Sequence, residues 1–119
     1  MAWSSWFDLT SNEVANEAPT SCGVYCLARK NDPMAYSAAP SLTVFIGVAG
    51  DRQRGLRAVL GDIAAASSGQ LQLERREHGG LRFCFQGNLG DKAPSLYSEL
   101  LAGFVKRHGE LPRCNRAES

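Results

Sequence analysis

Apolar residues recur along the chain with the period of a strand in some segments and of a helix in others. Residues 22–29, CGVYCLAR, form an almost continuous apolar and β-branched run, which is typical of a strand covered on both faces. Residues 42–49, LTVFIGVA, form a second such run. The segment between them holds two prolines and an Asn-Asp pair, which favour a loop. We therefore expect a long antiparallel hairpin whose first strand lies in the middle of a sheet.

The segment after the second strand shows the period of a helix that faces a core. Apolar residues recur there with the spacing i, i+3, i+4, i+7 and i+8, from Leu56 to Ala64. Asp51 is the expected N-cap of this helix, because its side chain can accept a hydrogen bond from the first turn. The Ser-Ser-Gly run at residues 67–69 is its expected end.

A third strand and a second helix are predicted further along the chain. Residues 81–87, LRFCFQG, alternate in polarity as a half-buried strand does. From Leu96 to Val105 the apolar residues return to the helical period, with Pro94 near the start and Gly109 at the end. The third strand is expected to turn Leu81, Phe83 and Phe85 to one side and Arg82 and Cys84 to the other.

Two further segments complete the predicted fold. Residues 71–80, LQLERREHGG, are expected to form a short irregular piece, and the aromatic N-terminal segment, residues 1–21, to pack as a short helix or turn over the sheet. The order strand, strand, helix, strand, helix then predicts a small α+β layer fold with a three-stranded, mainly antiparallel sheet flanked by helices. We expect a single domain over residues 1–119, with its core in residues 22–115.

The composition agrees with one globular domain and is typical of neither a disordered nor a fibrous protein. Of the 119 residues, 44% are apolar and 21% are charged. The formal net charge of +1 is no general basic excess, so a contact with nucleic acid must rest on a local patch of arginines. The chain shows neither a secretory signal pattern nor an apolar run of roughly 20 residues. We expect a cytoplasmic protein that does not associate with membranes.

The four cysteines are expected to be free thiols. Cys22 and Cys26 lie on one predicted strand, where a rise of about 3.3 Å per residue separates their Cα atoms by roughly 13 Å, too far for a disulfide. Cys84 and Cys114, together with the two histidines, match no known spacing of zinc ligands. No zinc site is therefore expected.

Three fragments follow one another along the predicted elements. They are GVY at Gly23–Tyr25, FIG at Phe45–Gly47, and ELLAGFVKRHGELPRCN at Glu99–Asn115. In this order, and with this order of strands and helices, residues 22–115 resemble the GIY-YIG nuclease superfamily. The N-terminal WFDLT is also similar to the segment before the first motif in some small members of that family.

The resemblance implies hydrolysis of a DNA phosphodiester bond with one divalent metal ion, Mg²⁺ or Mn²⁺. In the family's terms Tyr25 would help to activate the attacking water, Glu99 would hold the metal, and Asn115 would hold the end of the domain near the site. An arginine early in the first helix would stabilise the phosphate. These roles suit the residue types, because hard cations prefer carboxylate oxygens and a guanidinium matches two phosphate oxygens.

The motifs depart from the family pattern at two positions. Phe45 stands where the second motif has tyrosine, so one hydroxyl group is absent. An ungapped count from Gly47 puts the family's arginine position at Gly55, between Arg54 and Arg57. At about 100° per residue, Arg57 flanks the apolar stripe of the helix and Arg54 points away from it, which favours Arg57.

Each of these residues also has a structural interpretation. Tyr25 suits a buried position in a central strand, Glu99 falls off the apolar arc of its helix, and Asn115 suits a turn. Three functions therefore stay open: a metal-dependent endonuclease, the same fold without catalysis as a module that binds nucleic acid or a protein, and a structural protein that shares only the order of elements. For so small a domain, we expect a homodimer or a protein partner to supply any specificity.

Overall fold

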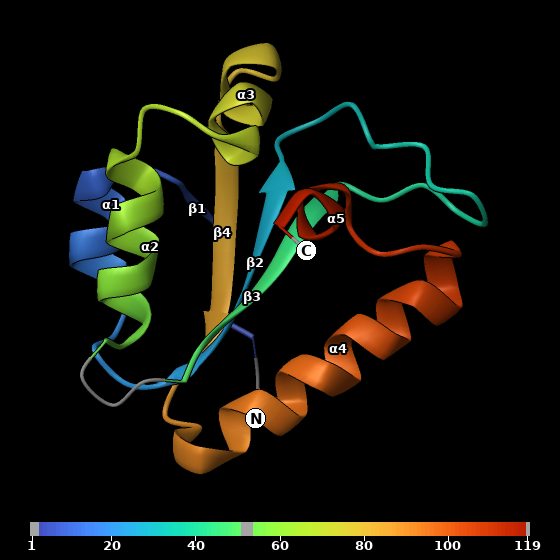
Figure 1. Ribbon diagram of the computed structural model, residues 1–119. Coiled ribbons are helices and arrows are strands. Elements are labelled where there is room, and N and C mark those ends of the chain that lie inside the picture. The colour runs from blue at the N-terminus through green and yellow to red at the C-terminus, as the bar shows by residue number, and fades with distance from the viewer. Residues whose placement is uncertain (1–2, 51–53, 119) are drawn as a thin grey trace.

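The computed structural model describes residues 3–50 and 54–118. Over these residues four strands form one antiparallel sheet in the order β1-β4-β2-β3, and helices pack on both of its faces (Figure 1). The elements are β1 (Phe7–Asp8), α1 (Ser11–Glu17), β2 (Gly23–Arg29), β3 (Thr43–Ala49), α2 (Leu56–Ala65), α3 (Gln70–Glu77), β4 (Leu81–Gln86), the 3-10 turn η1 (Gly90–Lys92), α4 (Ala93–His108) and α5 (Arg113–Glu118).

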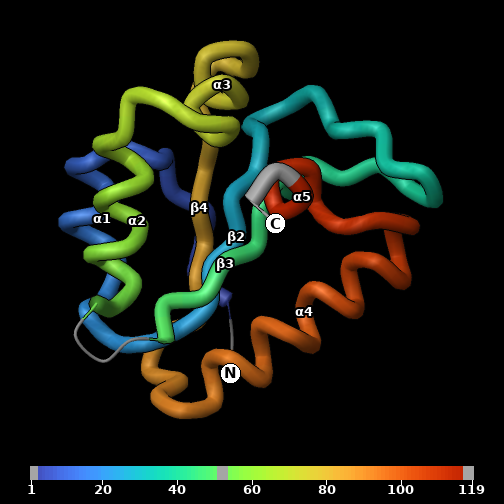
Figure 2. Tube along the Cα trace, in the orientation of Figure 1, coloured from blue at the N-terminus to red at the C-terminus, as the bar shows by residue number. Residues whose placement is uncertain are grey.

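The hairpin predicted from the two apolar runs is confirmed. β2 pairs antiparallel with β3 on one side and with β4 on the other, so the first strand of the hairpin lies in the interior of the sheet, as expected. The loop between β2 and β3 runs beside α5 (Figure 2). Tyr36 connects this loop to β3 and α5. Its hydroxyl donates to the Thr43 carbonyl at 2.7 Å and accepts from the Arg113 amide at 3.0 Å. Burial raises the pKa of Tyr36.

Side chains of β2 alternate between two differently covered faces of the sheet. Tyr25 and Leu27 belong to the core beneath α1 and α2, whereas Val24 and Cys26 pack on the side of α4. The two predicted amphipathic helices are confirmed as the covers of these faces. α2 contributes Leu56, Val59, Leu60, Ile63 and Ala64 to the first core, and α4 contributes Ala93, Leu96, Tyr97, Leu100, Leu101 and Phe104 to the second.

The sheet has one strand more than the sequence pattern predicts. Phe7 pairs with Phe83 and Asp8 with Arg82, so the N-terminal segment extends the sheet as β1 before it forms α1. A strand of two residues is too short to show an alternating pattern, which is why the segment was expected only to pack over the sheet.

The prediction of an irregular segment at residues 71–80 is wrong for its first part, because residues 70–77 form α3. The buried residues of this helix are polar, Gln72 and Glu74, so no apolar period marks it in the sequence. Gln72 donates from its amide nitrogen to the Ile63 carbonyl at 2.8 Å, which joins α3 to the end of α2. Tertiary contacts stabilise this helix.

A buried ion pair joins α3 to the sheet. Glu74 accepts two hydrogen bonds from the Arg29 guanidinium, from Nε at 2.9 Å and from a terminal nitrogen at 3.1 Å, and both side chains are at most 7% exposed. Arg113 places its Nε 2.9 Å from Oε1 of the same carboxylate, the oxygen that also accepts from the terminal nitrogen of Arg29. The hydrogen bond from Arg29 to Glu74 raises the pKa of Arg29. One carboxylate thus connects β2, α3 and α5.

Replacing Glu74 by glutamine should lower the free energy of unfolding by about 3 kcal/mol, because Arg29 would remain buried without its counter-charge. Chemical denaturation followed by circular dichroism measures this change. Glu77→Gln is the matched control on the same helix, since Glu77 is exposed and should change stability by less than about 0.5 kcal/mol. Equal effects of the two substitutions would contradict a structural role for the buried pair.

Candidate functional site

The two short motifs of the sequence meet around the ring of Tyr25. Tyr25 is the register partner of Gly47 on the neighbouring strand, and a Cβ atom at Gly47 would overlap with Cζ, Cε1 and the hydroxyl of the tyrosine ring. The ring of Phe45 lies beside it, with centroids 6.0 Å apart. Tyr25 is 4% exposed. The glycine of the second motif therefore makes room for the tyrosine of the first, inside the core.

Asn115 holds the second motif from outside the sheet. Its Oδ1 accepts from the Ile46 amide at 2.8 Å, and its Nδ2 donates to the Ile46 carbonyl at 2.9 Å. Asn115 is 8% exposed, so these two bonds form in a buried environment. Asn115 thereby attaches α5 to β3 at the middle residue of FIG.

The beginning of α2 is closed by the chain that precedes β2. Gly55 is the N-cap residue, and Asp51, the expected N-cap, lies outside the described residues. The Leu56 amide donates to the Ser21 carbonyl at 3.0 Å, and the Arg57 amide donates to the Pro19 carbonyl at 2.9 Å. These amides would otherwise be available to an anion, as they are at an open helix N-terminus. The start of α2 is a packed junction.

The two candidate arginines have structural partners. Arg57 is exposed, and its Nε donates to the Ala18 carbonyl at 2.8 Å. Arg54 forms an ion pair with Asp62 on α2. Gly55, at the family's arginine position, leaves no space for a side chain, because a Cβ atom there would overlap with the Thr20 carbonyl.

Glu99 lies on the other side of the sheet from Tyr25. α4, which carries Glu99, covers the face of Val24 and Cys26, and Tyr25 points to the face covered by α2. Glu99 is exposed and lines a surface cavity of about 470 Å³. The structure thus brings Tyr25, Phe45 and Gly47 together and does not bring Glu99 to them. The other residues that line this cavity are Gln86, Leu89, Lys92, Ser95 and Leu96.

This donor set does not fit the divalent metal that the family resemblance implies. Glu99 is the carboxylate of the cavity, and Lys92 adds a cation beside it. Mg²⁺ and Mn²⁺ prefer several oxygen ligands, chiefly carboxylates. Within residues 3–50 and 54–118, no three histidine, cysteine, aspartate or glutamate side chains gather where they could hold a metal ion.

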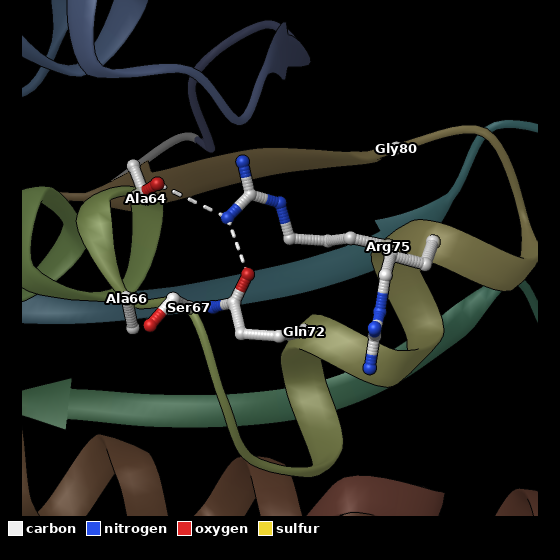
Figure 3. A pocket seen from close by; sticks show the side chains of 7 residues that line it. Ala64, Ala66, Ser67, Gln72, Arg75 and Gly80 are labelled. Carbon is white, nitrogen blue, oxygen red and sulfur yellow. Dashed lines mark hydrogen bonds between the residues drawn. The ribbon is translucent and has the colours of Figure 1, made fainter.

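A second cavity, of about 420 Å³, lies between α2 and α3 (Figure 3). The guanidinium of Arg75 reaches across it and donates to the Ala64 carbonyl at 3.1 Å and to Gln72 Oε1 at 2.6 Å. The other terminal nitrogen of Arg75 donates to the Leu9 carbonyl at 3.2 Å. Arg75 therefore joins carbonyls at the end of α2 to the N-terminal segment, and its role in this cavity is structural.

A third cavity, of about 350 Å³, is bounded by two tryptophans, and we call it the tryptophan pocket. Trp3 and Trp6 are 38% and 42% exposed. Arg107 reaches the pocket from α4, and the Arg82 guanidinium lies over the Trp6 ring at 5.6 Å from its centroid. The pocket is lined by Trp3, Ser4, Trp6, Cys26, Thr43, Ile46, Cys84, Leu100, Phe104 and Arg107.

The position of Trp6 follows from the extra strand. Phe7 packs with Phe83 on the face covered by α2, so the alternation of β1 turns Trp6 to the opposite face, toward Cys84. Ser4 holds the preceding chain to β4, because its amide donates to the Phe85 carbonyl at 2.9 Å and its hydroxyl accepts from the Phe85 amide at 3.0 Å. The sequence pattern does not predict this pocket, because it indicates only that the N-terminal aromatic residues pack over the sheet.

Comparisons of the chain with protein-family models, with curated proteins and with solved structures gave no match. The likeness to the GIY-YIG superfamily therefore rests on the motifs themselves. Among the residues that the structure describes, no helix is both long enough and apolar enough to cross a membrane.

Replacing Gly47 by alanine should lower the free energy of unfolding by about 2 kcal/mol, because the new methyl group would overlap with the packed ring of Tyr25. The cost should shrink in a Tyr25→Leu background, which lacks the overlapping atoms. A double-mutant cycle by denaturant unfolding measures the coupling. Gly61→Ala on α2 is the control, since its Cβ meets open space and should stabilise the helix by about 0.5–1 kcal/mol. Additive effects of Gly47→Ala and Tyr25→Leu would contradict the contact.

Proposed function

We propose that this chain is a GIY-YIG-like module that binds single-stranded DNA at the tryptophan pocket and does not cut it. The observation that carries the proposal is the meeting of two half-exposed tryptophans with the guanidinium groups of Arg82 and Arg107. Aromatic faces stack on unpaired bases of any sequence, and guanidinium groups pair with the phosphates between them. Such a patch binds nucleic acid without a large net charge on the whole protein.

Basic residues continue from the pocket along the last turn of α4. Lys106 and Arg107 are both exposed there, so positive charge extends beside the aromatic walls. A flexible single strand can follow such a surface with its bases unstacked, whereas the bases of a duplex are held inside the helix. This difference favours single-stranded DNA as the ligand.

Three features of the motif residues support binding without hydrolysis. Phe45 has no hydroxyl, and Tyr25 is buried in the core. Glu99 lies on the other face of the sheet, beside Lys92. A general base and a metal ligand have to reach the same phosphate, and these groups belong to different surfaces.

The second candidate function is the metal-dependent endonuclease itself. The observation that favours it is the pairing of Tyr25 with Gly47 and the two bonds of Asn115 to Ile46, which keep the GVY and FIG motifs side by side. In that case DNA would be the substrate, and a homodimer or a protein partner would supply specificity.

Titration with oligothymidylate should quench the intrinsic fluorescence of the protein, because Trp3 and Trp6 are its only two tryptophans and both line the pocket. Affinity should fall as salt is raised, since bound phosphates release counterions. Trp6→Ala should weaken binding by about 1–3 kcal/mol through the lost stacking. Arg76→Ala, a change at an exposed arginine of α3 outside the pocket, should leave the affinity unchanged. Absent or salt-independent quenching would refute the proposal.

The same protein distinguishes the two functions when it is incubated with supercoiled plasmid and Mg²⁺ or Mn²⁺. We expect the plasmid to remain intact. Nicking that Glu99→Ala abolishes, while the variant keeps its native circular dichroism spectrum, would establish the endonuclease instead.

A further inference from the structure

Two thiols lie side by side at the floor of the tryptophan pocket. Cys26 on β2 and Cys84 on β4 are register partners, directly opposite one another across two hydrogen-bonded strands. Both turn to the face of α4, where they line the pocket. None of the four cysteines, all of which lie within the described residues, forms a disulfide. The pocket therefore gives a small molecule in solution a route to this pair.

The backbone holds the two cysteines at a separation that suits a disulfide. Directly opposed residues of an antiparallel pair have Cα atoms about 4.5 or 5.5 Å apart, depending on the type of pair. Disulfides span Cα separations of about 4.4–6.8 Å. Either type of pair falls within that range, so Cys26 and Cys84 can be bridged without movement of the strands.

The two thiols share one hydrogen bond, which makes them chemically unequal. The thiol of Cys26 donates to Cys84 and lowers the pKa of Cys84 below its usual value. The same bond, together with burial, raises the pKa of Cys26. A thiolate is the reactive form of cysteine, so this direction favours Cys84 as the attacking thiol and Cys26 as the second thiol.

We propose that Cys26 and Cys84 form a redox-active dithiol that exchanges with small anionic disulfides of the glutathione class. The thiolate of Cys84 attacks one sulfur of the disulfide, which forms a mixed disulfide and releases one thiolate. Cys26 then loses its proton to that thiolate and attacks the sulfur of Cys84, which releases a second small thiolate that takes up the proton Cys84 gave to solvent when it ionised. Two protein thiols are oxidised and one disulfide is reduced to two thiols, so electrons and protons balance.

The surroundings of the pair suit this class of substrate. Arg107 lines the pocket and offers a cation to a substrate carboxylate. Cys22 is about as buried as Cys84, but Cys22 and Cys114 lie outside the pocket and have no cysteine as a strand partner. They serve as internal controls in the same molecule. The inference does not depend on the binding of DNA.

Incubation of the folded, reduced protein with glutathione disulfide, followed by acid quenching, alkylation and peptide mass spectrometry, tests the proposal. We expect a Cys26–Cys84 cross-link that dithiothreitol reverses, with Cys22 and Cys114 recovered as alkylated thiols. In Cys26→Ser the reaction should stop at the mixed disulfide, with glutathione retained on Cys84. In Cys84→Ser the modification of Cys26 should be at least about tenfold slower, because the thiolate is lost. Cys22→Ser should form the cross-link at the unchanged rate.

Three outcomes would overturn the proposal. One is the absence of a Cys26–Cys84 cross-link in the folded protein, and another is a cross-link that forms only in denaturant. The third is oxidation of Cys22 or Cys114 at the same rate as the pair. Circular dichroism shows whether each serine variant is folded. If a variant is unfolded, the cross-links found in the unaltered protein by peptide mass spectrometry still decide the question.

Discussion

β2 is hydrogen-bonded along both edges and packed on both faces, and the other elements take their places from it. Val24 and Leu27 point to opposite faces, and neither has exposed surface. Because neighbouring side chains of a strand alternate, a slip of one residue would move every side chain of β2 to the wrong core. This register places the ring of Tyr25 under α2 and the thiol of Cys26 under α4. The burial of β2 therefore determines which of its side chains lie on each face of the sheet.

The junction before α2 shows why residue 55 has no space for the arginine that the family resemblance places there. The resemblance implies an arginine early in this helix that would stabilise a phosphate, and the ungapped count puts it at Gly55. In the structure Gly55 fits against the backbone of Thr20, and carbonyls of the preceding chain accept hydrogen bonds from the first amides of the helix. The close approach of the two chains at residue 55 needs a glycine. The hydrogen bonds of this junction occupy the backbone amides that an anion would need. The arginine function and this junction exclude one another at residue 55.

The sequence predicted those parts of the fold that depend on apolar periodicity. The hairpin, the alternation of β4 and the core faces of α2 and α4 all followed from runs of apolar residues. The sequence does not predict α3, because this helix is held by the pairing of Glu74 with Arg29. These two residues are far apart in the sequence, so their ion pair produces no periodic pattern of apolar residues.

The same distinction applies to the candidate site. The apolar runs predicted the antiparallel pairing of the two strands that carry Tyr25 and Gly47, but not the register that sets these residues opposite one another. The separation of Glu99 from Tyr25 depends on which face of the sheet α4 covers, and the position of Glu99 on its own helix does not determine that. The pairing of Cys26 with Cys84 requires the register between two strands that are far apart in the sequence.

The amide of Asn115 also acts as a substitute neighbour for the last strand of the sheet. β3 has no further strand beside it within the described residues, so its outward amides and carbonyls form a template on which another chain could add a strand. Asn115 occupies one donor and one acceptor of that template, and α5 packs over the strand. A foreign strand has to displace α5 before it can pair there. Helix α5 thus covers the edge of the sheet at which another chain could add a strand.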